Sequence, residues 1–176
     1  MSVWSIIENE PAAAAALGWR QWLGPDFGAA AAFCLRETPR RTDRVPCPRG
    51  CGCAHRVVAP GAKNRQSPIA NSREGWLIGV CDCDEPDCED LQLRAEDTVV
   101  WEVDLAKLGR AVARALEMDG RSADLGVSRA RQIGAFGPAA MPVVLVAHPV
   151  GRGLNQLVDG WESLGRTFWA IVPAAA

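Results

Sequence analysis

The chain has 176 residues, an apolar fraction of 48% and a formal net charge of −2. A chain of this length can bury roughly 70% of its unfolded surface, so it can form a hydrophobic core without disulfide bonds. The charge balance excludes a polycation, and no apolar run reaches the length of a membrane-spanning helix. The first residues lack the basic region of a signal peptide and include Glu8, Glu10 and Pro11. We therefore expect a cytoplasmic protein, in which clustered thiols bind metals more often than they form disulfides.

The first 35 residues are predicted to be helical. Apolar residues such as Trp19 and Leu23 recur at helical spacings around an alanine run at 12–16. Pro25 interrupts the pattern, and a second helix is expected over residues 27–35. The following segment, residues 36–46, is polar and has no periodicity, so it is predicted to be a loop.

Two short apolar segments, residues 55–59 and 76–80, are predicted to be the strands of a β-hairpin. Each carries a group of cysteines at its outer end. Residues 91–93 fit either a short strand or the start of a helix. Residues 98–103 have the β-branched content of a strand, but their acidic lead-in also suits a helix start.

The last third of the chain has the pattern of an α/β unit. Asp104 is expected to cap a helix over residues 105–118, which Gly120 ends. Strands are predicted at 131–136, 142–147 and 167–172, and a helix at 154–164. A strand, a helix and a second strand with short connections predict a parallel strand pair with a right-handed crossover. The buried stripe of the first of these helices is expected to comprise Leu105, Leu108, Val112, Ala115 and Leu116.

The predicted fold class is therefore α+β. We expect N-terminal helices at 1–35, a zinc-stabilised β-hairpin module at 36–95 and a C-terminal α/β body at 96–176, all within one compact domain.

Six of the seven cysteines fall in two clusters. The first cluster reads Cys-Pro-Arg-Gly-Cys-Gly-Cys-Ala-His from residue 47, and the second reads Cys-Asp-Cys-Asp-Glu-Pro-Asp-Cys from residue 81. Structural zinc sites take four such donors, with short spacings inside each pair. The candidate metal ligands are Cys47, Cys51, Cys53, His55, Cys81, Cys83 and Cys88.

The Cys-Pro-x-x-Cys-Gly string that starts at Cys47 resembles a zinc knuckle, in which glycine lets backbone amides turn toward a sulfur. Over residues 47–88 the pattern is similar to the zinc-ribbon and treble-clef class, without pointing to a named family. That resemblance implies a Zn²⁺ ion that stabilises the fold.

Seven donors exceed the need of one zinc ion, so two arrangements stay open. In the favoured one, a single Zn²⁺ takes two donors from each cluster. In the other, two Zn²⁺ ions share a bridging thiolate. An iron–sulfur cluster, redox-active thiols and a catalytic zinc are weaker alternatives. Cys34 lies apart from both clusters and is interpreted as a small buried residue.

The charges are unevenly distributed along the chain. Residues 36–73 carry nine basic and two acidic groups, whereas residues 74–104 carry eleven acidic groups and one arginine. The basic segment could contact nucleic-acid phosphates, although the two segments could instead neutralise each other within the hairpin. The candidate phosphate contacts are Arg40, Arg41, Arg44, Arg49, Arg56, Lys107, Arg110 and Arg114.

The sequence thus predicts a zinc-stabilised, nucleic-acid-associated or regulatory factor without catalytic activity. The first alternative is a zinc-stabilised protein–protein adaptor, which would use exposed tryptophans and the acidic segment. The second alternative is a metal- or thiol-dependent enzyme.

Overall fold

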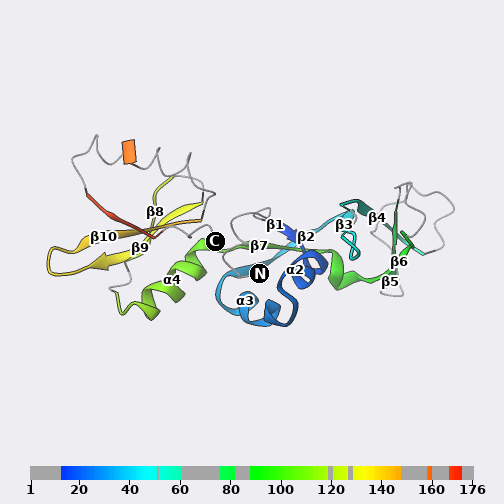
Figure 1. Cartoon of the computed structure of the whole chain (residues 1–176), viewed down its shortest axis with the longest axis horizontal. Helices are drawn as coiled ribbons and strands as arrows, with labels where there is room; N and C mark the ends of the chain where they lie inside the picture. The colour runs from blue at the N-terminus through cyan, green and yellow to red at the C-terminus, as the bar shows by residue number, and fades with distance from the viewer. Residues whose placement is uncertain are drawn as a thin grey trace. The chain divides into compact units, whose positions relative to one another are not determined.

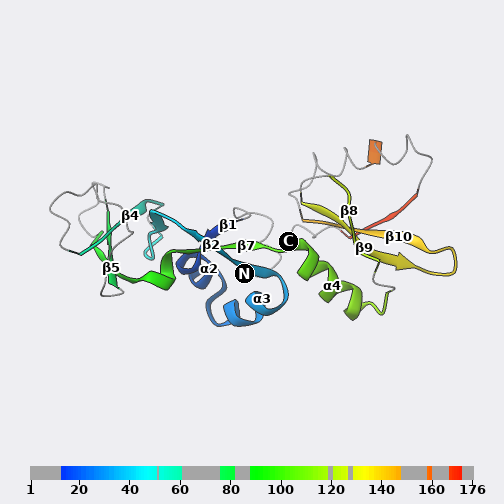
Figure 2. The same cartoon turned by 180° about the vertical axis from the view of Figure 1, so that it is seen from behind.

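The computed structural model describes residues 13–50, 52–60, 76–81, 88–118, 121–126, 129–147, 158–159 and 167–171 (Figures 1 and 2). The chain forms two compact units. One comprises residues 13–27 and 37–102 and is called the metal unit below. The other has its described residues within 28–36 and from 103 onward, and is called the α/β unit.

The metal unit contains a four-stranded antiparallel sheet in the order β3-β4-β5-β6. The pairing of β4 with β5 confirms the predicted hairpin. Buried side chains from all four strands, namely Val45, Val57, Leu77 and Leu93, form a core together with Ala15. The four strands are β3 (Arg44–Pro46), β4 (Ala54–Val58), β5 (Trp76–Val80) and β6 (Leu91–Arg94).

A three-stranded sheet has the order β1-β7-β2, with β1 at Ala13–Ala15, β7 at Val99–Val103 and β2 at Leu35–Arg41. The prediction of a loop over residues 36–46 was therefore wrong, since β2 and β3 occupy most of it. The reason is that β2 is an edge strand whose residues after Leu35 are mostly exposed. Such a strand needs no apolar alternation, so its sequence resembles a loop.

Between residues 13 and 35, the part of the N-terminal segment that is described, the helices are α2 (Ala16–Leu23), the 3₁₀ helix η1 (Gly24–Asp26) and α3 (Phe27–Phe33). The alanine run was expected to be helical, but Ala13–Ala15 form strand β1, which pairs with β7. The side chain of Trp19 is buried, and its indole nitrogen donates to the carbonyl oxygen of Trp101 at 3.0 Å. A second 3₁₀ helix, η3 (Ala95–Thr98), links β6 to β7.

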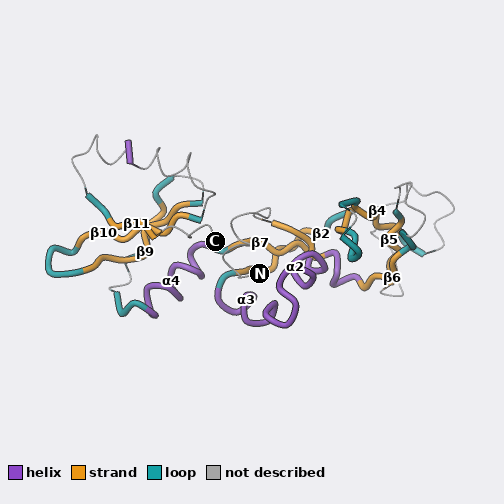
Figure 3. Tube along the Cα trace, viewed as in Figure 1, coloured by secondary structure: helices purple, strands orange, loops and turns teal. Residues whose placement is uncertain are grey.

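The α/β unit contains helix α4 (Leu105–Ala115) and a sheet in the order β11-β10-β9-β8 (Figure 3). The pairing of β10 with β11 is parallel, as predicted. The helix expected at 154–164 lies outside the described residues, apart from residues 158 and 159. The strands are β8 (Ala123–Asp124), β9 (Ala130–Phe136), β10 (Met141–Val146) and β11 (Trp169–Ile171).

Helix α4 begins as predicted but ends three residues early. The Asp104 side chain accepts a hydrogen bond from the backbone N–H of Lys107 and caps its start. At its end, Glu117 adopts a left-handed conformation with φ 51°, and the backbone N–H of Met118 reaches the carbonyl oxygen of Ala113. This is the Schellman pattern, formed here without the expected glycine.

The stripe that α4 buries is narrower than predicted. Leu108, Gly109 and Ala113 are buried, whereas Leu116 is 50% exposed beyond the end of the helix. Gly109 lets α4 approach β9 closely, because a β-carbon there would lie 2.5 Å from Cγ2 of Ile133. The close packing of α4 against β9 therefore depends on a glycine, which a search for apolar residues does not detect.

Candidate metal centre

Four side chains of the metal unit converge on one point. Their ligand atoms all lie within 4.8 Å of one another. Two of these residues flank the turn between β3 and β4, one lies within β4, and one precedes β6. They are Cys47, Cys53, His55 and Cys88.

The spacing of these atoms fits a tetrahedral zinc ion. The Sγ atom of Cys88 lies 3.6 Å from Sγ of both Cys47 and Cys53, and 3.7 Å from Nε2 of His55. With Zn–S bonds of about 2.3 Å and Zn–N bonds of about 2.0–2.1 Å, tetrahedral edges are about 3.8 Å between sulfurs and about 3.6 Å between sulfur and nitrogen. The three measured edges agree with these values.

The turn between β3 and β4 positions the two cysteines of the first cluster. The backbone N–H of Cys47 donates to the carbonyl oxygen of Cys53, and the N–H of Gly50 donates to the carbonyl oxygen of Cys47, both at 3.1 Å. Gly50 and Gly52 have φ values of 72° and 77°, a region that other residues rarely adopt. The glycines of the knuckle-like string thus allow the tight turn that directs both sulfurs to the site.

His55 is fully buried, and both of its ring nitrogens have a neighbour. Its Nδ1 atom lies 3.2 Å from the carbonyl oxygen of Gly79 in the adjacent strand β5. A carbonyl oxygen only accepts, so Nδ1 carries the proton and Nε2 presents its lone pair toward Cys88. A carbonyl behind a ligating histidine fixes its tautomer and orientation in many metal sites.

Sequence reasoning missed the role of Gly79. A glycine inside an otherwise apolar strand often marks a place where another group approaches closely. A β-carbon at Gly79 would lie 3.2 Å from Cβ of His55. The glycine within the predicted strand 76–80 was the available signal.

A fourth thiol lies beside the four candidate ligands. The Sγ atom of Cys81, directly after β5, is 3.2 Å from Sγ of Cys53. Cys81 does not belong to the group whose ligand atoms are all within 4.8 Å of one another. Cys51 and Cys83, the other two predicted ligands, lie outside the described residues.

Little space remains around the ligands. A cavity of about 60 Å³ is lined by Cys47, His55 and Cys88 together with neighbouring residues of the same turn and strand. Small-molecule sites typically have volumes of about 300–1,000 Å³, so this space suits an ion rather than an organic substrate. A closed set of four protein ligands is the arrangement of structural zinc sites.

Cys34 takes no part in this centre. It is fully buried in the α/β unit, and its thiol donates to the carbonyl oxygen of Ala30 at 3.3 Å. Burial raises the pKa of Cys34 to about 11, while the nearby ammonium group of Lys107 acts in the opposite direction. A thiol with such a pKa stays protonated and unreactive near neutral pH.

Several of the predicted phosphate contacts have partners within the protein. Arg40 pairs with Glu102 at 3.1 Å, and Arg49 pairs with Glu89 at 3.5 Å. The guanidinium group of Arg41 donates to the carbonyl oxygen of Ala95 and to Oγ1 of Thr98. The pair formed by Arg49 and Glu89 links the basic and acidic segments, the mutual neutralisation that the charge pattern suggested.

The three predicted phosphate contacts on α4 differ in their surroundings. The Lys107 ammonium group donates to the carbonyl oxygens of Ala31 and Leu35, at 2.5 and 2.9 Å. It therefore connects α4 to α3 and to the first residue of β2. Arg110 and Arg114 are exposed.

Arg44 and Arg56 stand directly opposite each other in the register of β3 and β4. Their neighbours Val45 and His55 are buried, so alternation places the two arginines on the other face of the sheet. Like charges opposite each other on neighbouring strands destabilise the pair.

Comparison of the chain with protein-family models, with curated proteins and with solved structures finds no match. Among the described residues, no helix combines the length and apolar character needed to cross a membrane. The Cys₃His cluster is thus the feature on which a functional interpretation rests.

Proposed function

We propose that this chain is a non-catalytic binding protein whose metal unit is held together by one structural Zn²⁺ ion and contacts nucleic-acid phosphates. The observation that carries the zinc assignment is the closed set of Cys47, Cys53, His55 and Cys88, with tetrahedral edge lengths and a carbonyl behind the histidine. Three thiolates and one neutral imidazole form a common structural zinc set.

The zinc ion would stabilise the metal unit directly. The strands β3 to β6 are short, and their shared core is small. The ligands come from the β3–β4 turn, from β4 and from the residues before β6. Because β3 and β6 are the two edge strands, one ion would connect the two edges of the sheet. Binding energy at such a site is folding energy.

The face that carries Arg44 and Arg56 is the proposed phosphate contact. Arginine suits this role because its planar guanidinium donates two parallel hydrogen bonds to a phosphate. The cross-strand arrangement supports the proposal, since it places two arginines opposite each other on one face of the sheet. Arg40, Arg41 and Arg49 are held by partners within the metal unit and would contribute less.

The test is salt-dependent binding to duplex DNA and RNA, measured by fluorescence anisotropy with the zinc-loaded protein. Affinity should fall with salt, with a log–log slope of about −0.9 per neutralised phosphate on DNA. Arg44→Gln and Arg56→Gln should each reduce the slope by about 1. Arg121→Gln removes the same charge from an exposed position of the α/β unit and should leave the slope unchanged. Salt-insensitive binding, or none, would exclude the nucleic-acid role while leaving the zinc site untouched.

A protein–protein adaptor is the second candidate, and Trp76 favours it. This tryptophan at the start of β5 is 43% exposed, and the guanidinium carbon of Arg94 lies 5.7 Å from its ring centroid. Tryptophan and arginine are the residues most enriched among the energetically dominant contacts of protein interfaces. In this case Trp76→Ala would abolish partner binding, and Arg44→Gln would leave it intact.

A further inference from the structure

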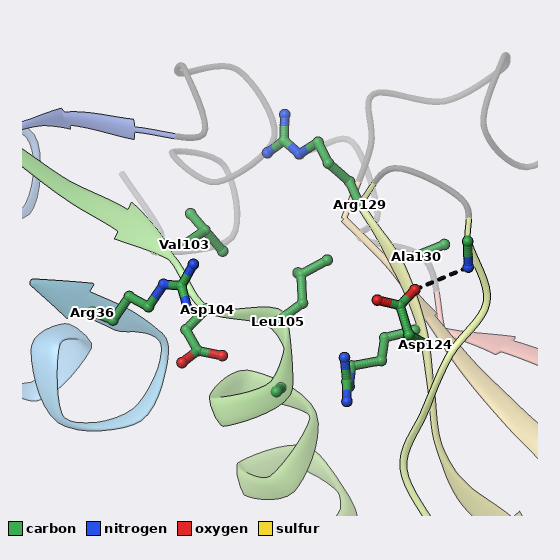
Figure 4. A pocket seen from close by; sticks show the side chains of 10 residues that line it. Arg36, Val103, Asp104, Leu105, Asp124, Arg129 and Ala130 are labelled. Carbon is green, nitrogen blue, oxygen red and sulfur yellow. Dashed lines mark hydrogen bonds between the residues drawn. The ribbon is translucent and has the colours of Figure 1, made fainter. Parts of the chain in front are cut away.

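A second site of interest lies in the α/β unit, away from the residues of the metal centre in the sequence. A cavity of about 570 Å³ opens where helix α4 begins (Figure 4). Small-molecule sites typically have volumes of about 300–1,000 Å³, so this cavity has room for a metabolite. Its polar and charged lining comprises Arg36, Asp104, Asp124, Arg129 and Arg131.

The two carboxylates of the cavity are engaged in local backbone structure. The side chain of Asp104 accepts from the N–H of Lys107 at 2.9 Å, and that of Asp124 accepts from the N–H of Gly126 at 2.9 Å. Figure 4 shows Asp104 and Asp124 on opposite sides of Leu105. Three arginines against two such carboxylates leave the lining with a positive balance.

Arg131 is held in position by its neighbours. Its Nε atom donates to Oγ of Ser122 at 2.8 Å, and it stands opposite Asp124 in the register of β8 and β9. These contacts orient the guanidinium group before a ligand arrives. A side chain that is already held in place loses less conformational entropy when a ligand binds.

Arg129 has an unusual backbone conformation. Its φ of 59° lies in the left-handed region, which is uncommon for residues other than glycine, and its carbonyl oxygen accepts from the N–H of Ala147 at 2.8 Å. Strained conformations of this kind are concentrated at binding and catalytic sites. Burial also lowers the pKa of Arg129, which shows that its charged form is partly desolvated.

We infer that the cavity binds a small phosphorylated molecule, whose negative charge is recognised by the arginines of the lining, Arg36, Arg129 and Arg131. A phosphate monoester carries a charge of about −1.5 to −2 at pH 7 and offers three strong acceptor oxygens, which suits three arginines better than a single carboxylate does. The first turn of α4 also lines the cavity, and a helix start favours negative charge. This site is independent of the proposed nucleic-acid contact, because Arg44 and Arg56 belong to the metal unit.

Isothermal titration calorimetry with inorganic pyrophosphate tests the inference on the full zinc-loaded chain at low salt. We expect saturable binding of one pyrophosphate per chain, weakened at least about tenfold by Arg129→Gln or Arg131→Gln through loss of a charge-assisted hydrogen bond. Arg121→Gln, a matched exposed control, should change the affinity less than about twofold. Thermal melts identify any variant that fails to fold, and Arg131→Lys then serves as the milder replacement.

Three outcomes would overturn the inference. The first is the absence of saturable heat with pyrophosphate. The second is tighter binding of acetate than of pyrophosphate, which would indicate a carboxylate site. The third is an equal loss of affinity in Arg121→Gln, or a loss in Arg44→Gln but not in Arg129→Gln, which would place the binding elsewhere on the protein.

Discussion

The Nδ1 atom of His55 and the carbonyl oxygen of Gly79 lie 3.2 Å apart on the neighbouring strands β4 and β5. This contact joins the metal centre to the sheet, because the same imidazole directs Nε2 toward Cys88. The position of strand β5 therefore determines how the histidine meets a metal ion. Residue 79 has to be small for this arrangement, since Cβ of His55 and Cβ of Leu91 both lie close to it.

Gly79→Ala should weaken zinc binding. The added β-carbon would lie 3.2 Å from Cβ of His55, from Cβ of Leu91 and from Cδ1 of Leu93, closer than ordinary contact distances. Because the imidazole has to move, we expect the zinc affinity to fall by about 10–100-fold, as when other groups behind metal ligands are changed. Competition with a chromophoric chelator measures this change. Gly28→Ala, where a β-carbon meets nothing within 4 Å, is the control, and an equal affinity for both variants would contradict the assigned role of Gly79.

Cys88→Ser should release the zinc ion and unfold the metal unit. The Sγ atom of Cys88 is adjacent to all three other ligand atoms, so its loss leaves the ion with an incomplete set. Elemental analysis of the purified variant measures the bound zinc, and circular dichroism follows the fold. Cys34→Ala removes a thiol from the α/β unit and should keep its full zinc content. Retention of a full zinc equivalent by Cys88→Ser would show that a different set of donors binds the ion.

Gly109→Ala should destabilise the α/β unit. Alanine is the better helix former by about 1 kcal/mol, but its β-carbon would lie 2.5 Å from Cγ2 of the buried Ile133. Overpacking of this kind costs about 1–3 kcal/mol, so the steric effect should prevail. Urea unfolding measures the free energy of unfolding. Gly28→Ala in α3 is the control, because alanine there is the better helix former and its β-carbon meets no other atom within 4 Å; this variant should be neutral or stabilised. A stabilised Gly109→Ala would mean that α4 and β9 are farther apart than described.

The ionisation of Cys34 should make the stability fall at alkaline pH. Burial raises the pKa of this thiol from an ordinary value of 9.0 to about 11, so the unfolded chain ionises first as the pH rises. The stabilising contribution is complete below pH 9 and is lost as the pH approaches 11, by at most about 3 kcal/mol. The decrease between pH 8.5 and 10.5 should be smaller in Cys34→Ala. The same slope in both proteins would show that another group is responsible.

The sequence predicted the α+β class, the β4–β5 hairpin and the parallel pairing of β10 with β11, because apolar runs and turn residues determine these locally. It did not predict β2, since an edge strand with exposed polar residues lacks alternation. It also did not single out the four ligands that converge. The favoured arrangement took two donors from each cluster, whereas three donors of the first cluster, Cys47, Cys53 and His55, converge with Cys88 of the second among the described residues.

The cavity of the α/β unit illustrates a second limit of sequence reasoning. Arg36, Arg129 and Arg131 lie far apart in the chain or alternate with uncharged residues, so no local pattern connects them. They line one cavity only because β2, α4 and β9 meet there. The charge pattern of the sequence drew attention to residues 36–73, which include Arg36 but neither Arg129 nor Arg131, and two arginines of that segment, Arg40 and Arg49, are paired with carboxylates.

Native mass spectrometry combined with elemental analysis of the purified protein tests the central claim most directly. We predict one zinc ion per chain, bound by Cys47, Cys53, His55 and Cys88, and lost together with the fold of the metal unit when a strong chelator is added. Two zinc ions per chain would contradict the single site and would bring the remaining cysteines into the coordination. Iron with visible absorbance, or a folded metal unit without any metal, would contradict the zinc centre itself.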